Sequence, residues 1–452
     1  MEYIPKDVAM ATAALTGFNR NRYKLETSGA TSAGPSSIVT ITLPSNALID
    51  LKSLRVFMDL TTDSDSTTKV WGKLPSDVSS VISSCEVYIG GVQVTQSCSE
   101  WNTVSKILKI VRCSRDRDGS VEKLLSHGIM SDSEAIDDVS VVLSDFKGFL
   151  GESSTRYLPT SLTGDVTIRL TFAPASVLGF VEGDGGTTVT SVAMGANFSG
   201  AGARTAAAGL SYSATNIYAT CDTISLGDTY ERMLLDRLSS EAFLPINFKE
   251  YYTYSQHGTA ATAHTVRFSL SAASIDACYA VFRDSNYQTA GIKAQTYAGS
   301  VNTSDHVSNY FFFKSFNDSN LKRGALKYHW TCANVRHPQY QANVLDAAAD
   351  LSLLTNNTHT NEKGHMITSL EHFNQGAFIL PLILNMPGQS INVASGYNSK
   401  GSNTTFSLEV SGQTMPSASA APQTTAAIST FVVVETTAQL RISGSRQCSV
   451  SF

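Results

Sequence analysis

Leu48–Asp59 reads LIDLKSLRVFMD, and about half a chain later Ser274–Asp284 reads SIDACYAVFRD. With one gap allowed, Ile, Asp, Val, Phe and Asp recur in the same order in both stretches. The matched pairs are Ile49/Ile275, Asp50/Asp276, Val56/Val281, Phe57/Phe282 and Asp59/Asp284. A single match of this kind arises by chance, so a duplication needs a second match further along the chain.

A second match follows in the same order. Val92 and Gln96 correspond to Val335 and Gln339, and a predicted helix follows each of these two stretches. The second half is longer between the two matches, and the extra length falls within residues 284–309, which read as a loop. A repeat of about half the chain is too long for a solenoid and predicts a duplicated domain.

The strands of each half alternate between apolar and polar residues. Val39, Ile41 and Leu43 alternate with threonines, which predicts a strand with one buried face. Residues 166–172 repeat the pattern. About eight such strands in each half suit two packed antiparallel sheets. The predicted fold class is therefore all-β: two tandem eight-stranded jelly rolls, with short helices in loops and between the barrels.

Three helices are expected between the strands. Residues 99–111 carry Trp101, Val104, Leu108 and Val111 at helical spacing, with Ser99 as the cap. Residues 228–240 and 343–354 show similar apolar stripes. The predicted organisation is an N-terminal arm (1–30), a first jelly roll (31–227) with a Gly/Ala-rich loop (179–209), a connecting helix (228–244) and a second jelly roll (245–452).

Charge argues against a protein that coats nucleic acid. The chain has 452 residues and a formal net charge of -5, whereas neutralising phosphates requires a positive excess. Arg20, Arg22 and Lys24 cluster in the predicted arm. We interpret them as part of a solvated arm of mixed charge, which leaves open a weak contact with a genome.

The seven cysteines are widely spaced and form no C-x-x-C motif, which fits a reducing compartment. The N-terminus lacks the apolar region of a secretory signal. The longest uncharged apolar run, residues 378–387, is too short to span a bilayer. We therefore expect a soluble protein made in the cytosol.

The sequence offers no catalytic motif. His359, His365 and His372 are spaced six and seven apart, which matches neither a helix face nor a zinc-protease motif. A G-x-S-x-G nucleophile elbow is absent, and GDGG at 183–186 precedes no helix. The carboxylate pairs Asp116/Asp118 and Asp137/Asp138 lie in short polar turns. We predict no catalytic, cofactor-binding or metal-binding residues, no cofactor, and no enzymatic activity.

Three segments carry a resemblance to a known family. They are TGDVTIRLTFAP (163–174), SLGDTYERMLLDRLSS (225–240) and ALKYHWTCANVRHPQYQ (325–341). In this layout the chain, from about residue 30 to its end, resembles the double jelly-roll major capsid proteins of icosahedral DNA viruses. The closest likeness is to the small eukaryotic branch of virophages, polinton-like viruses and adintoviruses.

The resemblance implies a homotrimer whose six barrels form a pseudo-hexagonal capsomer, which assembles into an icosahedral shell around a DNA genome. It implies contacts with neighbouring capsomers and with penton and minor capsid proteins, and no specific nucleic-acid site. The chain would be a compact member without large outer towers. It would be part of the virion, made in the host cytoplasm and assembled in cytoplasm or nucleus; an internal membrane is left open.

Two other classes of function stay open at this point. A trimeric viral fibre or spike, or a lectin-like β-sandwich recognition protein, would need an exposed cleft on one barrel. A β-sandwich enzyme acting on carbohydrates would need two convergent carboxylates, and no predicted strand places them suitably.

Overall fold

The structure is a computed structural model of the full chain. The residues that it describes are 19–65, 70–75, 77–95, 98–112, 138–183, 189–190, 211–225, 228–241, 243–285, 287, 292–297, 300–311, 313–316, 326–354, 373, 377–385, 396–401, 404–413, 427–443 and 447–452.

Eight strands of the described chain build a first unit between Asn19 and Ser225. In chain order they are β1 (Asn19–Ser28), β2 (Ile38–Thr42), β3 (Leu48–Thr62), β6 (Ile82–Ile89), β7 (Val92–Gln93), β8 (Asp138–Leu143), β10 (Val166–Phe172) and β13 (Tyr212–Ser225). They form the arrays β1-β13-β3-β8 and β2-β10-β6-β7. The end of β1 pairs with β2 and so joins the two arrays.

A second unit repeats this construction between Phe243 and Ser443. Its strands are β14 (Phe243–Thr259), β15 (His264–Ser269), β16 (Ile275–Asp284), β19 (Lys327–Cys332), β20 (Val335–Ala342), β21 (Leu380–Ile383), β22 (Thr405–Ser411) and β23 (Ile428–Ser443). They form the sheets β14-β23-β16-β21 and β15-β22-β19-β20.

The strand order is the same in both units. Numbered within its own unit, one array of each runs first-eighth-third-sixth and the other runs second-seventh-fourth-fifth. Two such antiparallel sheets face to face make a jelly roll. The predicted fold class is confirmed. The opening repeat lies on the third strand of each unit, β3 and β16, and Val92 and Val335 begin the fifth strand of each, β7 and β20.

Helices also occupy matching places. α2 (Trp101–Arg112) follows the fifth strand of the first unit, and α7 (Val344–Leu354) follows the fifth strand of the second. Between the units lies α6 (Asp228–Glu241), whose Leu234 and Leu238 are buried as their spacing predicts. None of the helices in the described part of the chain combines the length and the apolar character needed to span a membrane.

Burial alternates along some strands, as the sequence pattern predicts, and is continuous along others. β10 alternates strictly between buried and half-buried residues, as its Val-Thr-Ile-Arg-Leu-Thr-Phe sequence predicts. β16 is buried at every position except its last, and β23 is buried at its first eleven positions. A strand buried on both faces has protein on both sides. α2 of the first unit contributes to this cover, because its apolar side chains share a core with those of β16 and β23.

Several segments differ from the sequence prediction. Asn19–Ser28, predicted as part of the 1–30 arm, is strand β1 because its backbone pairs with β13; residues 1–18 lie outside the described part. The second unit begins with β14 at Phe243, inside the range assigned to the connecting helix. The expected loop 179–209 contains β11 (Gly179–Gly183) and β12 (Val189–Thr190), and 284–309 contains the hairpin of β17 (Ile292–Tyr297) and β18 (Ser300–Ser308).

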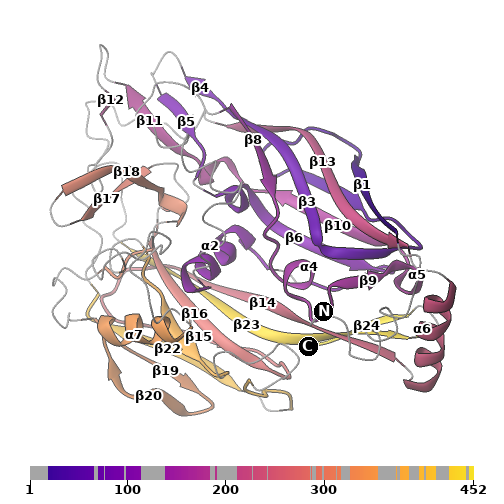
Figure 1. The fold of residues 1–452 in the computed structure, drawn as a ribbon. Coiled ribbons are helices and arrows are strands. Elements are labelled where there is room, and N and C mark those ends of the chain that lie inside the picture. Colours follow the sequence, from indigo (N-terminus) through magenta and orange to yellow (C-terminus); the bar gives the residue numbers. More distant parts are fainter. Residues whose placement is uncertain are drawn as a thin grey trace.

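Short elements complete the described chain. β11 and β12 extend a small sheet with β4 (Ser64–Asp65) and β5 (Val70–Lys73), and β9 (Tyr157–Pro159) and β24 (Cys448–Ser451) pair with β3 and β23. The short helices are α4 (Phe149–Glu152), α5 (Thr160–Thr163), η1 (Val78–Val81), η4 (Ala175–Val177) and η6 (Asn309–Phe311). Figure 1 shows the small sheet and the β17–β18 hairpin at the same end of the molecule, away from α6.

Candidate functional site at the seam between the two units

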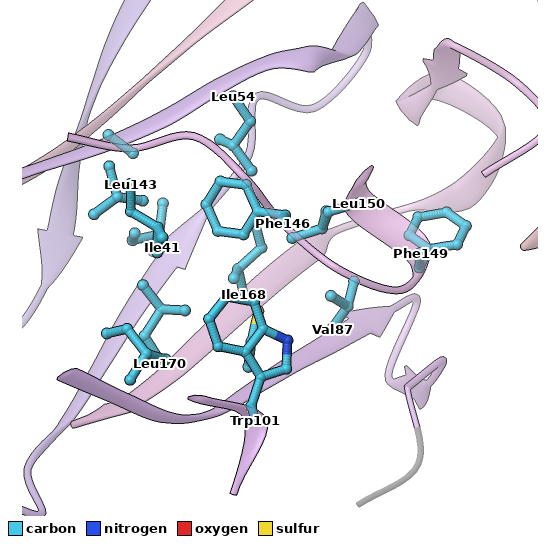
Figure 2. Close-up of a cluster of buried hydrophobic side chains, with 14 of the residues drawn as sticks. Ile41, Leu54, Val87, Trp101, Leu143, Phe146, Phe149, Leu150, Ile168 and Leu170 are labelled. Atoms are coloured by element: carbon cyan, nitrogen blue, oxygen red, sulfur yellow. The ribbon is translucent and has the colours of Figure 1, made fainter. Parts of the chain in front are cut away.

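The two units meet along a seam formed chiefly by α2 and by the long strands β14 and β23. α2 belongs to the first unit in sequence, yet it divides its apolar side chains between two cores. Trp101 packs in the first core together with Phe146 and Ile168 (Figure 2). Further along the helix, Val104, Ile107, Leu108, Ile110 and Val111 pack in the second core. Residues 101–111 of α2 are all buried except Lys106 and Lys109, so the helix is buried between the two units.

β14 and β23 reach from the second unit to the first. Figure 1 shows both strands running beneath the first unit towards α6. Their ends, Ile246 and Phe248 of β14 with Leu440 and Ile442 of β23, belong to the first core. Each unit therefore contributes side chains to the core of the other.

β14 contacts α4 and the residues just after it in the first unit through main-chain hydrogen bonds, side-chain hydrogen bonds and aromatic packing. Phe149 and Phe248 meet edge to face with ring centroids 5.4 Å apart. The Ser154 amide donates to the Asn247 carbonyl at 2.7 Å, and the Tyr251 hydroxyl donates to Glu152 at 2.6 Å. Backbone pairing across the seam makes the contact directional as well as apolar.

A buried ion pair crosses the seam at the start of α2. Arg283 of β16 is 1% exposed, and its Nη2 lies 2.9 Å from Oε2 of Glu100. Glu100 also accepts hydrogen bonds from the hydroxyls of Thr103 and Tyr287, at 2.9 and 3.2 Å. The guanidinium lies 3.7 Å from the Tyr287 ring centroid and near the rings of Tyr310 and Phe431. This pairing offsets the large cost of burying a charge.

The repeated aspartates of the opening match are buried anchors in both units. Asp50 of β3 is 1% exposed and accepts two hydrogen bonds from Arg156, at 3.0 and 2.8 Å. Asp276 of β16 is 3% exposed; it pairs with Lys249 at 2.6 Å and accepts from Thr437 at 2.6 Å. In both units the third strand thus carries a buried carboxylate that is paired with a basic side chain.

A second carboxylate accompanies each aspartate, on the eighth strand. In the first unit Asp222 of β13 is the register partner of Asp50 and accepts from Arg20 and Arg22 of β1, at 3.0 and 2.7 Å. In the second unit Glu435 of β23 lies 3.2 Å from Lys249 of β14. In both units a cation from the first strand thus faces acids on the third and eighth. The strand register shifts beside both clusters.

The pKa values of these groups follow from their pairing. The hydrogen bond from Arg22 lowers the pKa of Asp222, more than burial raises it. Burial by itself lowers the pKa of Lys249, but the carboxylates of Glu435 and Asp276 outweigh burial, so the pKa lies above its usual value. Asp222 and Lys249 are therefore charged near neutral pH.

The structure places the residues singled out in the sequence as follows. Arg20 and Arg22, predicted to be solvated, are engaged with Asp222 although their side chains are half or more exposed. Lys24 lies 4.6 Å from the Tyr218 ring centroid. Asp116, Asp118, Asp137, His359, His365 and His372 lie outside the described residues. Within the described part of the chain, no group of three His, Cys, Asp or Glu residues is arranged to hold a metal ion.

Other expectations concern thiols and the helix cap. Cys85, Cys221, Cys278 and Cys332 are buried free thiols, and burial raises the pKa of each.

Ser99, predicted to cap α2, instead shares a hydrogen bond of 2.8 Å with Thr253 of β14, because α2 begins after Glu100.

The seam ion pair was missed by sequence reasoning, although a signal was present. In the opening match Arg283 stands where the first half has Met58, which is 2% exposed in β3. An arginine at a position whose counterpart is apolar and core-facing indicates a buried cation with a partner.

The sequence matches no family model and no curated protein. Among solved structures, the PBCV-1 virus capsid is 15% identical with a TM-score of 0.57, covering 97% of both chains. PBCV-1 VP54, fitted into a reconstruction of the virophage Sputnik, is 14% identical with a TM-score of 0.59 and the same coverage. The Faustovirus major capsid protein is 8% identical with a TM-score of 0.51, covering 94% of this chain and 91% of its own.

These likenesses extend over nearly the whole of each chain, so they include both units and the seam between them. At such low identity the likeness is one of fold. The strand order within each unit and the matches across both units agree: this chain has the double jelly-roll fold, which it shares with the PBCV-1 capsid and the Faustovirus major capsid protein.

Proposed function

We propose that this chain is the major capsid protein of an icosahedral DNA virus. The observation that carries the proposal is the pair of units with identical strand order in one chain, matched along 97% of its length by the PBCV-1 capsid. The proposal makes the protein a structural component of the virion and not an enzyme.

The architecture suits a tile in a shell. Three copies around a closed threefold axis place six similar barrels in a ring, which gives a pseudo-hexagonal capsomer. The six barrels of such a capsomer can tile a surface only if the two barrels of each chain keep a fixed angle to one another. The shared cores and the ion pair between Arg283 and Glu100 support such rigidity.

The inserted strands suggest which end faces outward. The small sheet around β5 and β11 and the β17–β18 hairpin gather at one end, and both units insert strands between their third and fourth strands. Inserted segments find room where no neighbouring tile packs. We therefore propose that this end forms the outer surface and that the α6 end faces the interior.

The proposed partners follow from the same role. They are two further copies in the trimer, neighbouring capsomers, and penton and minor capsid proteins. No specific nucleic-acid site is proposed. The pairing of Arg20 and Arg22 with Asp222 supports a structural role for these two arginines, so any contact of the N-terminal arm with a genome would be weak.

The test is assembly of the purified full-length chain. Light scattering after gel filtration should give three times the chain mass of 48.4 kDa, and negative-stain micrographs should show six-lobed particles that form sheets or shells at higher concentration. A protein that stays monomeric under every salt, pH and concentration condition would contradict the proposal. A small fixed oligomer whose size responds to added sugars would favour a recognition protein instead.

A further inference from the structure

Strand β1 differs from the other central strands because almost nothing of it is buried. Of its ten residues Asn19–Ser28, six in succession are exposed, and only Thr27 is buried. Strands whose side chains contribute little to a core have low local stability. Backbone pairing and charge therefore hold β1 in place.

The backbone pairing of β1 is mostly one-sided. Asn19–Glu26 pair with Tyr218–Ser225 of β13, and only Thr27 and Ser28 pair with β2. For most of its length the other edge of β1 has no described strand beside it. Detachment of β1 would thus break the ladder with β13 and the two-residue pairing with β2, and it would expose the edge of β13.

Charge supplies the specific attachment. Asp222 of β13 is buried, and it accepts from the Nε atoms of Arg20 and Arg22 at 3.0 and 2.7 Å. Arg20 also lies 3.7 Å from the second buried carboxylate, Asp50. Without the two arginines, Asp50 and Asp222 would face each other as register partners, and Arg156 on Asp50 would offset part of their repulsion.

The second unit provides an internal comparison. Its first strand, β14, places Lys249 on the equivalent carboxylates Asp276 and Glu435. Unlike β1, it also buries Ile246, Phe248 and Tyr251. In β14 the ion pairs therefore supplement apolar packing. In β1 the ion pairs have almost no apolar packing beside them.

We propose that β1 is a detachable strand, held to β13 by the Arg20 and Arg22 pairs with Asp222, which opens while the rest of the first unit stays folded. Opening frees Asn19–Ser28 and exposes the Tyr218–Ser225 edge of β13. This device does not depend on the proposed capsid role.

The direction of the pH response follows from the groups around Asp222. They are Arg20 and Arg22 from β1, Asp50 from β3, Arg156 beside Asp50, and the neighbouring thiol Cys221. Pairing lowers the pKa of Asp222, so the attachment is fully present above the usual aspartate range and is lost as the pH falls below it. Because the side chains of Arg20 and Arg22 are half or more exposed, added salt weakens their ion pairs with Asp222 near neutral pH.

Hydrogen–deuterium exchange of the full chain tests the proposal. At pH 7 the amides of β1 should exchange at least tenfold faster than those of Ile246–Tyr251 in β14, and raising NaCl from 0.05 to 0.5 M should accelerate β1 alone. The variant R20Q/R22Q should accelerate β1 by a further tenfold or more. Adding D222N to it should restore part of the protection, because it removes the repulsion between Asp50 and Asp222.

K24Q is the matched control, because Lys24 lies on the same strand but over the Tyr218 ring, away from Asp222. It should change β1 exchange less than twofold. Should R20Q/R22Q fail to fold, D222N alone replaces it and should accelerate β1 several-fold. Equal exchange in β1 and β14, or acceleration of the whole first unit together with β1, would overturn the proposal.

Discussion

The guanidinium of Arg283 in β16 lies 2.9 Å from the carboxylate of Glu100 at the start of α2, so a buried charge pair joins the two jelly rolls. Glu100 has a φ of 56°, a left-handed backbone conformation unusual for a glutamate. The seam thus holds Glu100 in a costly conformation that directs its carboxylate towards the second unit.

Loss of the Glu100 charge should cost more than loss of the Arg283 charge. E100Q leaves the Arg283 cation buried without a counter-charge, and we expect a loss of about 3 kcal/mol or more in the free energy of unfolding. R283M leaves a carboxylate with partial solvent access and two hydroxyl donors, so the loss should be smaller. Urea unfolding of both variants and of E100Q/R283M gives the coupling; strictly additive losses would contradict a direct interaction.

The two jelly rolls should unfold together. Because α2, β14 and β23 place side chains in both cores, neither unit keeps its core when the other opens. Calorimetry should show one transition, and Leu108→Ala in α2 should lower its midpoint at a cost of about 2–5 kcal/mol. Two resolved transitions, with Leu108→Ala moving only one of them, would show that the units are independent.

Asp77 should contribute an acid-sensitive part of the stability. Burial would raise the pKa of this carboxyl, but Lys109 of α2, at 2.6 Å, together with Lys106 and the Ser79 amide outweighs burial and holds the pKa at about 2. Because the folded pKa is below the unfolded value, the contribution is present above about pH 4 and is lost as the pH falls towards 2. D77N should cost about 2 kcal/mol at pH 7.

The measurement is the difference in unfolding free energy between the wild type and D77N at pH 7, 5, 4 and 3. Subtracting the variant removes the contribution of the other carboxyl groups. The difference should stay constant between pH 7 and 5 and shrink at pH 3. A difference that grows on acidification would contradict the assignment.

Gly151 of α4 should tolerate no side chain. A β-carbon built on it would lie 1.5 Å from the Phe146 carbonyl oxygen, a backbone atom that moves only with the whole segment. G151A should therefore destabilise by about 2 kcal/mol or more. The control is G34A, since nothing lies within 4 Å of the Gly34 position; its effect should be within about 0.5 kcal/mol. Equal effects would show that the backbone at α4 adapts.

Local pattern was sufficient for the repeated strands. The match of Ile49–Asp59 with Ile275–Asp284 identified the third strand of each unit, and the apolar spacing in 99–111 identified α2. These features depend on side-chain periodicity within a few residues, which each strand or helix carries by itself.

The sequence by itself determined that this protein is a duplicated all-β chain with helices at set places. Only the tertiary structure decided what the charged residues do: Arg22 reaches Asp222 across 200 positions, and Arg283 reaches Glu100 across 183. The reason is that periodicity reports which face of a strand is apolar. Which distant strand lies beside it, and so which carboxylate meets which cation, depends on how the whole sheet is threaded.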